Sequence, residues 1–162
     1  MRHAPAWRLD QGLSLIELVI ALAILALLAS LVLPMAEVTV TRTKELELRR
    51  VLRDIRTALD DYKADYDKAV AAKKIIANLA DSGYPKQLED LIEGRDWGGL
   101  YALPKKYLRR IPRDPFDRNL NGWGMRSYLD DPDSDAWGGE DVYDVYSRID
   151  KTALDGSYYR DW

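Results

Sequence analysis

The hydrophobic and polar positions divide the chain into an apolar first part and an amphipathic continuation. Residues 18–33 contain no charged side chain and nothing more polar than Ser30, and the apolar character continues to Val40 with one interruption at Glu37. A helix of this length would roughly span the ~30 Å hydrocarbon core of a bilayer. Because the run is apolar on all sides, we expect lipid or identical helices to surround it.

Residues 41–74 continue the pattern as a helix with a single apolar stripe. Apolar side chains recur there at steps of three and four, at Leu48, Val51, Leu52, Ile55, Ala58, Leu59, Tyr62, Tyr66 and Val70. Charged side chains occupy the other faces, and contact with solvent is the expected role of most of them. The stripe therefore predicts that residues 75–162 pack against this half of the helix.

The rest of the chain predicts a small α+β region. Residues 84–94 have Pro85 near their start and end at Gly94, which favours a short second helix. Residues 125–129 and 142–147 are predicted strands of a small antiparallel sheet. The predicted fold class is α+β, with a long N-terminal helix, half transmembrane and half amphipathic, packed on that sheet.

Composition and charge exclude several classes of protein. The 162 residues suffice for an anchor and one small domain, and they include no cysteine, so disulfides are excluded. A net charge of -3 gives no support for nucleic-acid binding. The mature chain shows no pattern of a nucleophile, a base or a cofactor-binding loop that would indicate an enzyme. Arg2 and Arg8 precede the apolar run, which predicts a cytoplasmic N-terminus and an exported C-terminal domain.

Residues 12–34, GLSLIELVIALAILALLASLVLP, resemble the N-terminus of type IV prepilins and type II secretion pseudopilins. The resemblance implies that residues 1–12 are a leader, that a prepilin peptidase cuts between Gly12 and Leu13, and that the new amine of Leu13 is methylated. A secretory signal peptide is the simpler alternative, but its cleavage site follows an apolar run of about 7–15 residues. Here the expected cut precedes a longer run, which favours the prepilin interpretation.

The same resemblance assigns residues 13–40 to a transmembrane and polymerisation helix. Glu17 stands where the family has a glutamate five residues into the mature chain, and Pro34 stands where many members have a helix-kinking proline. Leu13 and Ala26 depart from the residues that are usual at their positions. If Glu17 of each subunit meets the amine of a neighbour, two charges that are costly alone compensate each other in an apolar core.

Further residues narrow the resemblance to the major pseudopilin. Tyr84 and Pro85 before a leucine-bearing helix, YLRRIPRDPF at residues 107–116, and residues 144–162 are the similar parts. The resemblance implies an inner-membrane protein with a periplasmic domain that assembles into a pseudopilus for type II secretion. Its implied partners are copies of itself, the prepilin peptidase, an inner-membrane platform protein and other pseudopilins.

The resemblance also implies a calcium site in the C-terminal loop. Residues 130–162 carry ten carboxylates against three basic side chains, and calcium takes six to eight oxygen ligands. The positions similar to the family's ligands are Ser147, Asp150, Asp155 and Asp161. The family's run of consecutive aspartates is missing here, so the alternative is an ordinary turn at Asp155 and Gly156. Residues 117–122 and 131–142 are better explained as polar turns.

Two alternative functions stay open at this stage. The first is a type IV pilin of an extracellular fibre for adhesion, motility or DNA uptake, which cellular localisation separates from a pseudopilin. The second is a membrane-anchored module that binds calcium or another ligand. This module would keep Met1 or Arg2 at its N-terminus, whereas a pilin-like subunit begins at methylated Leu13.

Overall fold

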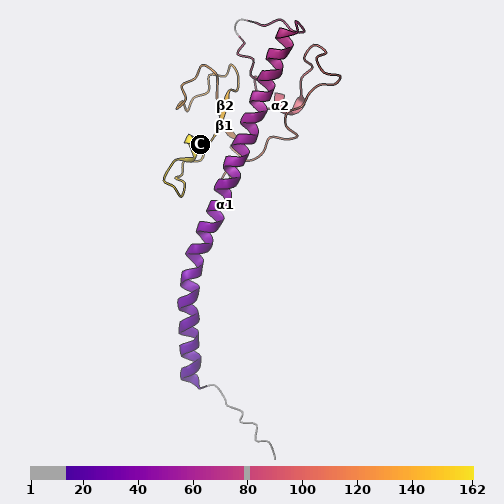
Figure 1. The fold of residues 1–162 in the computed structure, drawn as a ribbon. Helices are drawn as coiled ribbons and strands as arrows, with labels where there is room; N and C mark the ends of the chain where they lie inside the picture. Colours follow the sequence, from indigo (N-terminus) through magenta and orange to yellow (C-terminus); the bar gives the residue numbers. More distant parts are fainter. Residues whose placement is uncertain (1–13, 79–80) are drawn as a thin grey trace, which may run out of the picture. The chain divides into compact units, whose positions relative to one another are not determined.

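The computed structural model describes residues 14–78 and 81–162, with the backbone alone for residues 31–34. The chain divides into two compact units, Met1–Val40 and Thr41–Trp162, called unit 1 and unit 2 below. The elements, shown in Figure 1, are α1 (Leu15–Ala71), α2 (Asp90–Glu93), β1 (Trp123–Arg126), β2 (Asp144–Ser147) and the 3-10 helix η1 (Tyr159–Asp161).

Unit 1 consists, in its described part, of the first half of α1. The side chain of Ser14 caps the helix, because its Oγ accepts a hydrogen bond of 3.2 Å from the N–H of Glu17. Hydroxyl groups farther along bond to the helix itself, as when Ser30 Oγ donates to the carbonyl of Leu27 at 2.7 Å. Helix α1 includes position 34. The kink predicted at Pro34 stays a prediction.

Unit 2 is built on the second half of α1, and the predicted apolar stripe is the helical side of its core. Leu48, Leu52, Ile55, Ala58, Leu59 and Tyr62 are all buried there. Segments from much later in the chain cover them, with Leu91, Trp97, Val142, Val145 and Tyr159 among the buried residues. Figure 1 shows these segments as irregular loops with little regular structure of their own. Core packing therefore depends on side chains of α1 more than on a sheet.

Helix α1 ends with a left-handed residue. Lys73 has a φ of 54°. The N–H of Lys74 donates to the carbonyl of Ala69 at 2.9 Å, and the N–H of Lys73 donates to that of Val70 at the same distance. This arrangement satisfies carbonyls that the last helical turn leaves without partners.

The described sheet has two antiparallel strands, so the predicted α+β class with a small antiparallel sheet is confirmed. Trp123 pairs with Ser147, and Gly124 pairs with Tyr146. A methyl group at Gly124 would collide with the ring of Tyr146. Glycine is therefore required at this position because the tyrosine ring lies directly over the backbone.

The predicted bounds of the second helix were wrong. The sequence predicted a helix over residues 84–94, whereas α2 spans only Asp90–Glu93. The carbonyl of Pro85 instead accepts a hydrogen bond of 2.8 Å from the N–H of Val142. The Asp90 carboxylate accepts hydrogen bonds from the N–H groups of Lys86 and Gln87. Residues 85–87 therefore use their main-chain groups for contacts that a helix would not allow.

The first strand was also placed two residues too late. It was predicted over residues 125–129 but spans Trp123–Arg126. The carboxylate of Asp130 accepts hydrogen bonds from the N–H groups of Ser127 at 2.7 Å and Gly138 at 3.0 Å. This side chain closes a turn directly after the strand, so the ladder cannot continue.

Candidate functional site

The first candidate site is the apolar surface of unit 1. Its large side chains are exposed on every described side of the helix, for example Leu15 at 82%, Leu27 at 65% and Met35 at 74%. By length and composition, α1 is the one helix in the described part of the chain that could cross a membrane, and its most apolar stretch has a mean hydropathy of 2.9. A helix satisfies its own backbone hydrogen bonds, as a bilayer requires.

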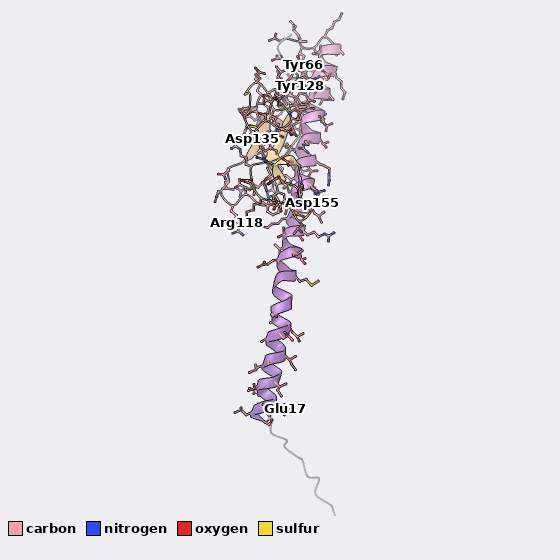
Figure 2. All side chains as sticks on the ribbon, turned by 90° about the vertical axis from the view of Figure 1, so that its left-hand side faces the viewer. Glu17, Tyr66, Arg118, Tyr128, Asp135 and Asp155 are labelled. Carbon is pink, nitrogen blue, oxygen red and sulfur yellow. The ribbon has the colours of Figure 1, made fainter. Side chains whose placement is uncertain are left out.

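Glu17 is the carboxylate at the start of this surface. It lies in the first turn of α1, and Figure 2 labels it near the helix start. The turn is anchored by the bond from its own N–H to Ser14 Oγ and by a bond of 3.1 Å from the N–H of Leu18 to the Ser14 carbonyl. The side chain of Glu17 is exposed. Gly12 and Leu13, the predicted cleavage and methylation positions, lie outside the described residues.

The four residues predicted to bind calcium do not form a cluster. Ser147 is fully buried, and its Oγ donates to Asp114 at 2.5 Å. Asp155 forms an ion pair of 3.0 Å with Arg49, and Asp161 lies 3.7 Å from Arg160. The described residues contain no group of three acidic, histidine or cysteine side chains arranged to hold a metal. Calcium binding by these four residues stays a prediction.

The carboxylate of Asp155 accepts the hydrogen bonds that close a turn. Ser157 donates to its Oδ1 through the main-chain N–H at 3.0 Å and through the hydroxyl at 2.6 Å. These bonds, together with nearby Arg49, lower the pKa of Asp155. The geometry thus supports the simpler interpretation of this position as a closed turn.

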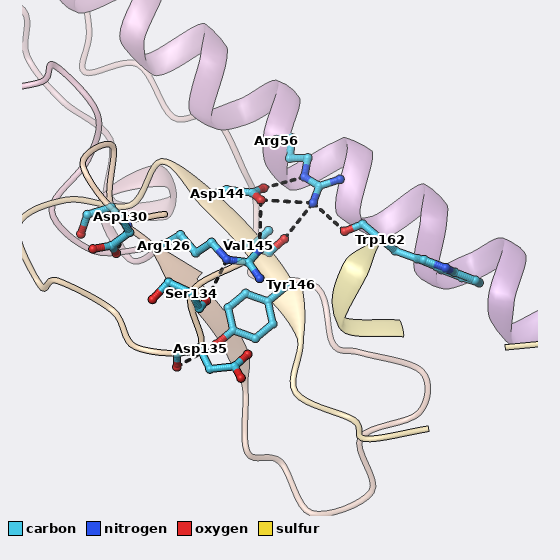
Figure 3. Close-up of polar contacts among 10 residues, drawn as sticks. Arg56, Arg126, Asp130, Ser134, Asp135, Asp144, Val145, Tyr146 and Trp162 are labelled. Carbon is cyan, nitrogen blue, oxygen red and sulfur yellow. Dashed lines mark hydrogen bonds and ion pairs between the residues drawn. The ribbon is translucent and has the colours of Figure 1, made fainter. Parts of the chain in front are cut away.

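A polar cluster around Arg56 joins α1 to the C-terminal strand and to the last residues. Arg56 Nε donates to Asp144 at 2.7 Å, and Arg56 Nη2 donates to the carbonyl oxygens of Val145 at 3.1 Å and Trp162 at 2.7 Å (Figure 3). Arg126 lies on the other side of Asp144, with Nη1 at 3.6 Å. One guanidinium therefore holds two segments that lie about ninety or more positions later in the chain.

A second polar cluster surrounds Asp65, whose carboxylate is fully buried in unit 2. It accepts hydrogen bonds of 2.8 Å from the hydroxyls of both Tyr101 and Tyr107, and it pairs with Lys105 at 2.6 Å. Burial by itself raises the pKa of Asp65, but the bonds from Lys105, the two tyrosines and Lys68 outweigh burial and lower it to about 2. This carboxylate ties the loop of residues 101–107 to α1.

Sequence reasoning assigned no role to Asp65 or Arg56. A signal for Asp65 was present, because it lies three positions after Tyr62 and four before buried Ala69, on the apolar side of the helix. A carboxylate on such a stripe needs partners, since an isolated buried charge is costly. No comparable signal marks Arg56, because its partners lie far away in the sequence.

Comparison with protein families returned one match, which covers residues 7–33 and is described as a prokaryotic N-terminal methylation motif. Comparisons with curated proteins and with solved structures returned no match. The motif supports a type IV pilin-like protein and indicates a structural subunit rather than an enzyme. It implies processing by a prepilin peptidase and assembly into a filament. Together with the apolar helix, it supports a single-pass membrane anchor.

Proposed function

We propose that the mature chain is a pseudopilin, a structural subunit of a periplasmic pseudopilus that drives type II protein secretion. The observation that carries the proposal is the exposed apolar helix of unit 1, with Glu17 in its first turn and a methylation motif around it. A surface of this kind has to be covered by lipid before assembly and by other subunits afterwards.

The assembly step follows from charge compensation. Cleavage after Gly12 exposes an amine at Leu13, and a methylated amine stays cationic. Glu17 of one subunit compensates the amine of a neighbour, so that neither charge remains alone among apolar side chains. Apolar contact between the helices supplies most of the attraction once they leave lipid, at about 25 cal/mol per Å² of surface removed from water. Within the bilayer this attraction between helices is weak, so unassembled subunits can stay in the membrane.

Two features favour a secretion pseudopilus over an extracellular pilus. The chain contains no cysteine, so the globular part has no disulfide-closed loop. The segment YLRRIPRDPF, residues 107–116, resembles the major pseudopilin. In unit 2 its Asp114 is buried and accepts hydrogen bonds from Ser147 and from the N–H of Phe116. The segment therefore helps to hold β2 in place.

Processing is tested first, by intact mass spectrometry of protein purified from membranes. The proposal requires a chain that lacks residues 1–12 and carries one added methyl group. The Gly12→Ala variant should keep its leader. A wild-type chain that retains its first twelve residues would overturn the proposal.

Assembly is tested with Glu17→Ala, which should be cleaved and inserted but should form few filaments. Glu37→Ala is the matched control, because it removes the other carboxylate of the apolar stretch and leaves Glu17 in place. Equal filament yields from the two variants would contradict the role of Glu17. Fractionation of assembling cells then separates a periplasmic pseudopilus from a surface pilus.

A further inference from the structure

Unit 2 contains a groove that none of the contacts above explains. It has a volume of about 780 Å³ and lies between α1 and the segment of residues 110–113. Glu47, Arg50 and Asp54 line it from the helix, and Arg110 and Arg113 line it from the segment opposite. Arg50 lies 3.9 Å from Asp54 at an exposed position. The two arginines of the segment give the groove an excess of positive charge.

Arg110 and Arg113 share the groove with Glu47, but neither arginine is in an ion pair in the part of unit 2 that the structure describes. Both side chains are exposed, and neither takes part in an ion pair or hydrogen bond there. The two acidic residues of the basic segment 105–118 are engaged elsewhere. Asp114 is bound to Ser147, and Asp117 accepts hydrogen bonds from the N–H groups of Asn119 and Gly122. The positive charge of the groove is therefore available to an outside partner.

The complementary charge lies on another loop of the same unit. Residues 130–141 contain six carboxylates and no basic side chain. Asp130 and Asp141 hold the turn from inside, by accepting main-chain hydrogen bonds. Asp131, Asp133 and Glu140 are exposed and, in the described part of the chain, make no ion pair or side-chain hydrogen bond. Three unused acids thus face solvent.

Within one copy, the hydrogen bonds and ring contacts at the two ends of the loop go to residues outside the groove. Asp141 accepts a hydrogen bond of 2.5 Å from Ser82, and the ring of Tyr128 stacks on Tyr84 with centroids 6.2 Å apart. These contacts fix the loop beside residues 82–84, whereas the groove lies beside residues 47–54. Figure 2 shows Tyr128 and Arg118 at separate places on unit 2. Within one chain, the described structure forms no ion pair between the two segments.

We propose that the acidic loop of one copy docks into the arginine-lined groove of the next copy, with Asp131 and Asp133 binding Arg110 and Arg113. The inference rests on the proposed function, because it requires copies held side by side in a filament. An interface that joins two different surfaces leaves a free loop and a free groove at each end, so it propagates without closing. Salt bridges of this kind also set the register between neighbours and weaken at high ionic strength.

The absence of cysteine makes a cross-linking test direct. The full chain carrying both Arg113→Cys and Asp133→Cys, expressed where the wild type assembles, should give a ladder of disulfide-linked multimers upon oxidation. Each single variant should give none beyond a dimer. Arg113→Cys combined with Asp61→Cys is the matched control, because Asp61 is an exposed acid on another part of unit 2.

Charge reversal provides the second readout. The pair Arg110→Glu and Arg113→Glu should cause loss of filaments, as should the pair Asp131→Lys and Asp133→Lys. All four changes together should restore filaments, which a folding defect would not do. If both pairs of changes abolish filaments but the four changes together fail to restore them, the arginines and the acids do not contact one another, and the inference is overturned.

The outcomes separate the inference from the proposed function. Suppose that the wild type assembles. If the charge-reversed variants then assemble equally well, or if the cross-linked ladder is no stronger than in the Asp61→Cys control, the docking is wrong and the filament role stands. If the wild-type chain never assembles, both are wrong.

Discussion

Lys105 Nζ lies 2.6 Å from a carboxylate oxygen of Asp65, whose side chain is only 1% exposed. Tyr101 and Tyr107 donate to the same carboxylate, and Trp97 Nε1 donates to the Tyr107 hydroxyl at 2.7 Å. Such a group stabilises a fold only when its partners are all present, because a buried charge without them is strongly destabilising. The loop that carries these partners is therefore fixed to α1 by one acidic side chain.

Asp65→Asn should lower the free energy of unfolding by about 2–3 kcal/mol, because it removes a charge that four donors share. Unfolding of the purified full chain in detergent, followed by the near-ultraviolet signal of the tryptophans and tyrosines, measures this loss. Asp67→Asn is the control two positions away, since its ion pair with Lys63 is half-exposed. It should change stability by less than about 0.5 kcal/mol. Equal losses in the two variants would contradict the role given to Asp65.

The Asp65 contribution should also depend on pH. The pKa of this carboxyl is about 2 in the fold against an ordinary value of 3.8, so unfolding takes up protons in this range. The stabilisation is complete above the ordinary value and is lost as the pH falls from 3.8 towards about 2. The difference between the denaturation midpoints of wild type and Asp65→Asn should therefore narrow over that interval. A constant difference down to pH 2 would mean that another group is responsible.

Arg56→Ala should release the end of the chain from α1. The substitution removes the donors to Asp144, Val145 and Trp162, and we expect it to cost about 1–2 kcal/mol of stability. Hydrogen exchange at residues 159–162 should increase more than exchange elsewhere in unit 2. Arg109→Ala, which changes an exposed arginine on another segment of unit 2, serves as the control and should leave exchange there unchanged.

Calcium binding by the C-terminal loop has its own test. If Ser147, Asp150, Asp155 and Asp161 bind the ion, excess calcium should raise the Tm of the wild type, and Asp150→Ala should abolish the rise. Because Arg49 neutralises Asp155 in the present arrangement, Arg49→Gln should enlarge the calcium effect. A Tm that responds to neither calcium nor a chelator would remove the metal from this loop.

Local sequence patterns were sufficient to predict α1 and its apolar stripe. The structure of residues 75–162 depends instead on contacts between residues that are distant in the sequence. Leu48, Leu52 and Ile55 follow a helical period, which is visible in any short window of sequence. The second helix was overestimated because Pro85 is compatible with a first helical turn, yet its carbonyl pairs with Val142 more than fifty positions later. No local pattern carries that information.

The site shows the same division. Glu17 and the apolar run are contiguous in sequence, and the family match falls on the same residues. By contrast, the four calcium positions were assigned by resemblance, and a resemblance in sequence does not show that Asp155 is paired with Arg49 or that Ser147 is buried against Asp114. The basic groove was missed for a similar reason, because Arg50 and Arg110 become neighbours only after folding.

The scarcity of strands in unit 2 bears on how a filament subunit withstands mechanical load. In the described part of the chain, one short ladder joins residues 123–126 to residues 144–147, and the other strand-like pairings are isolated bridges, Arg95 with Lys105 and Thr152 with Tyr158. A pull along α1 is then resisted by the apolar core and by side-chain contacts between α1 and the loops, among them those of Arg56 and Asp65. We therefore expect the force that separates the loops from α1 to depend on these side-chain contacts more than on strand pairing.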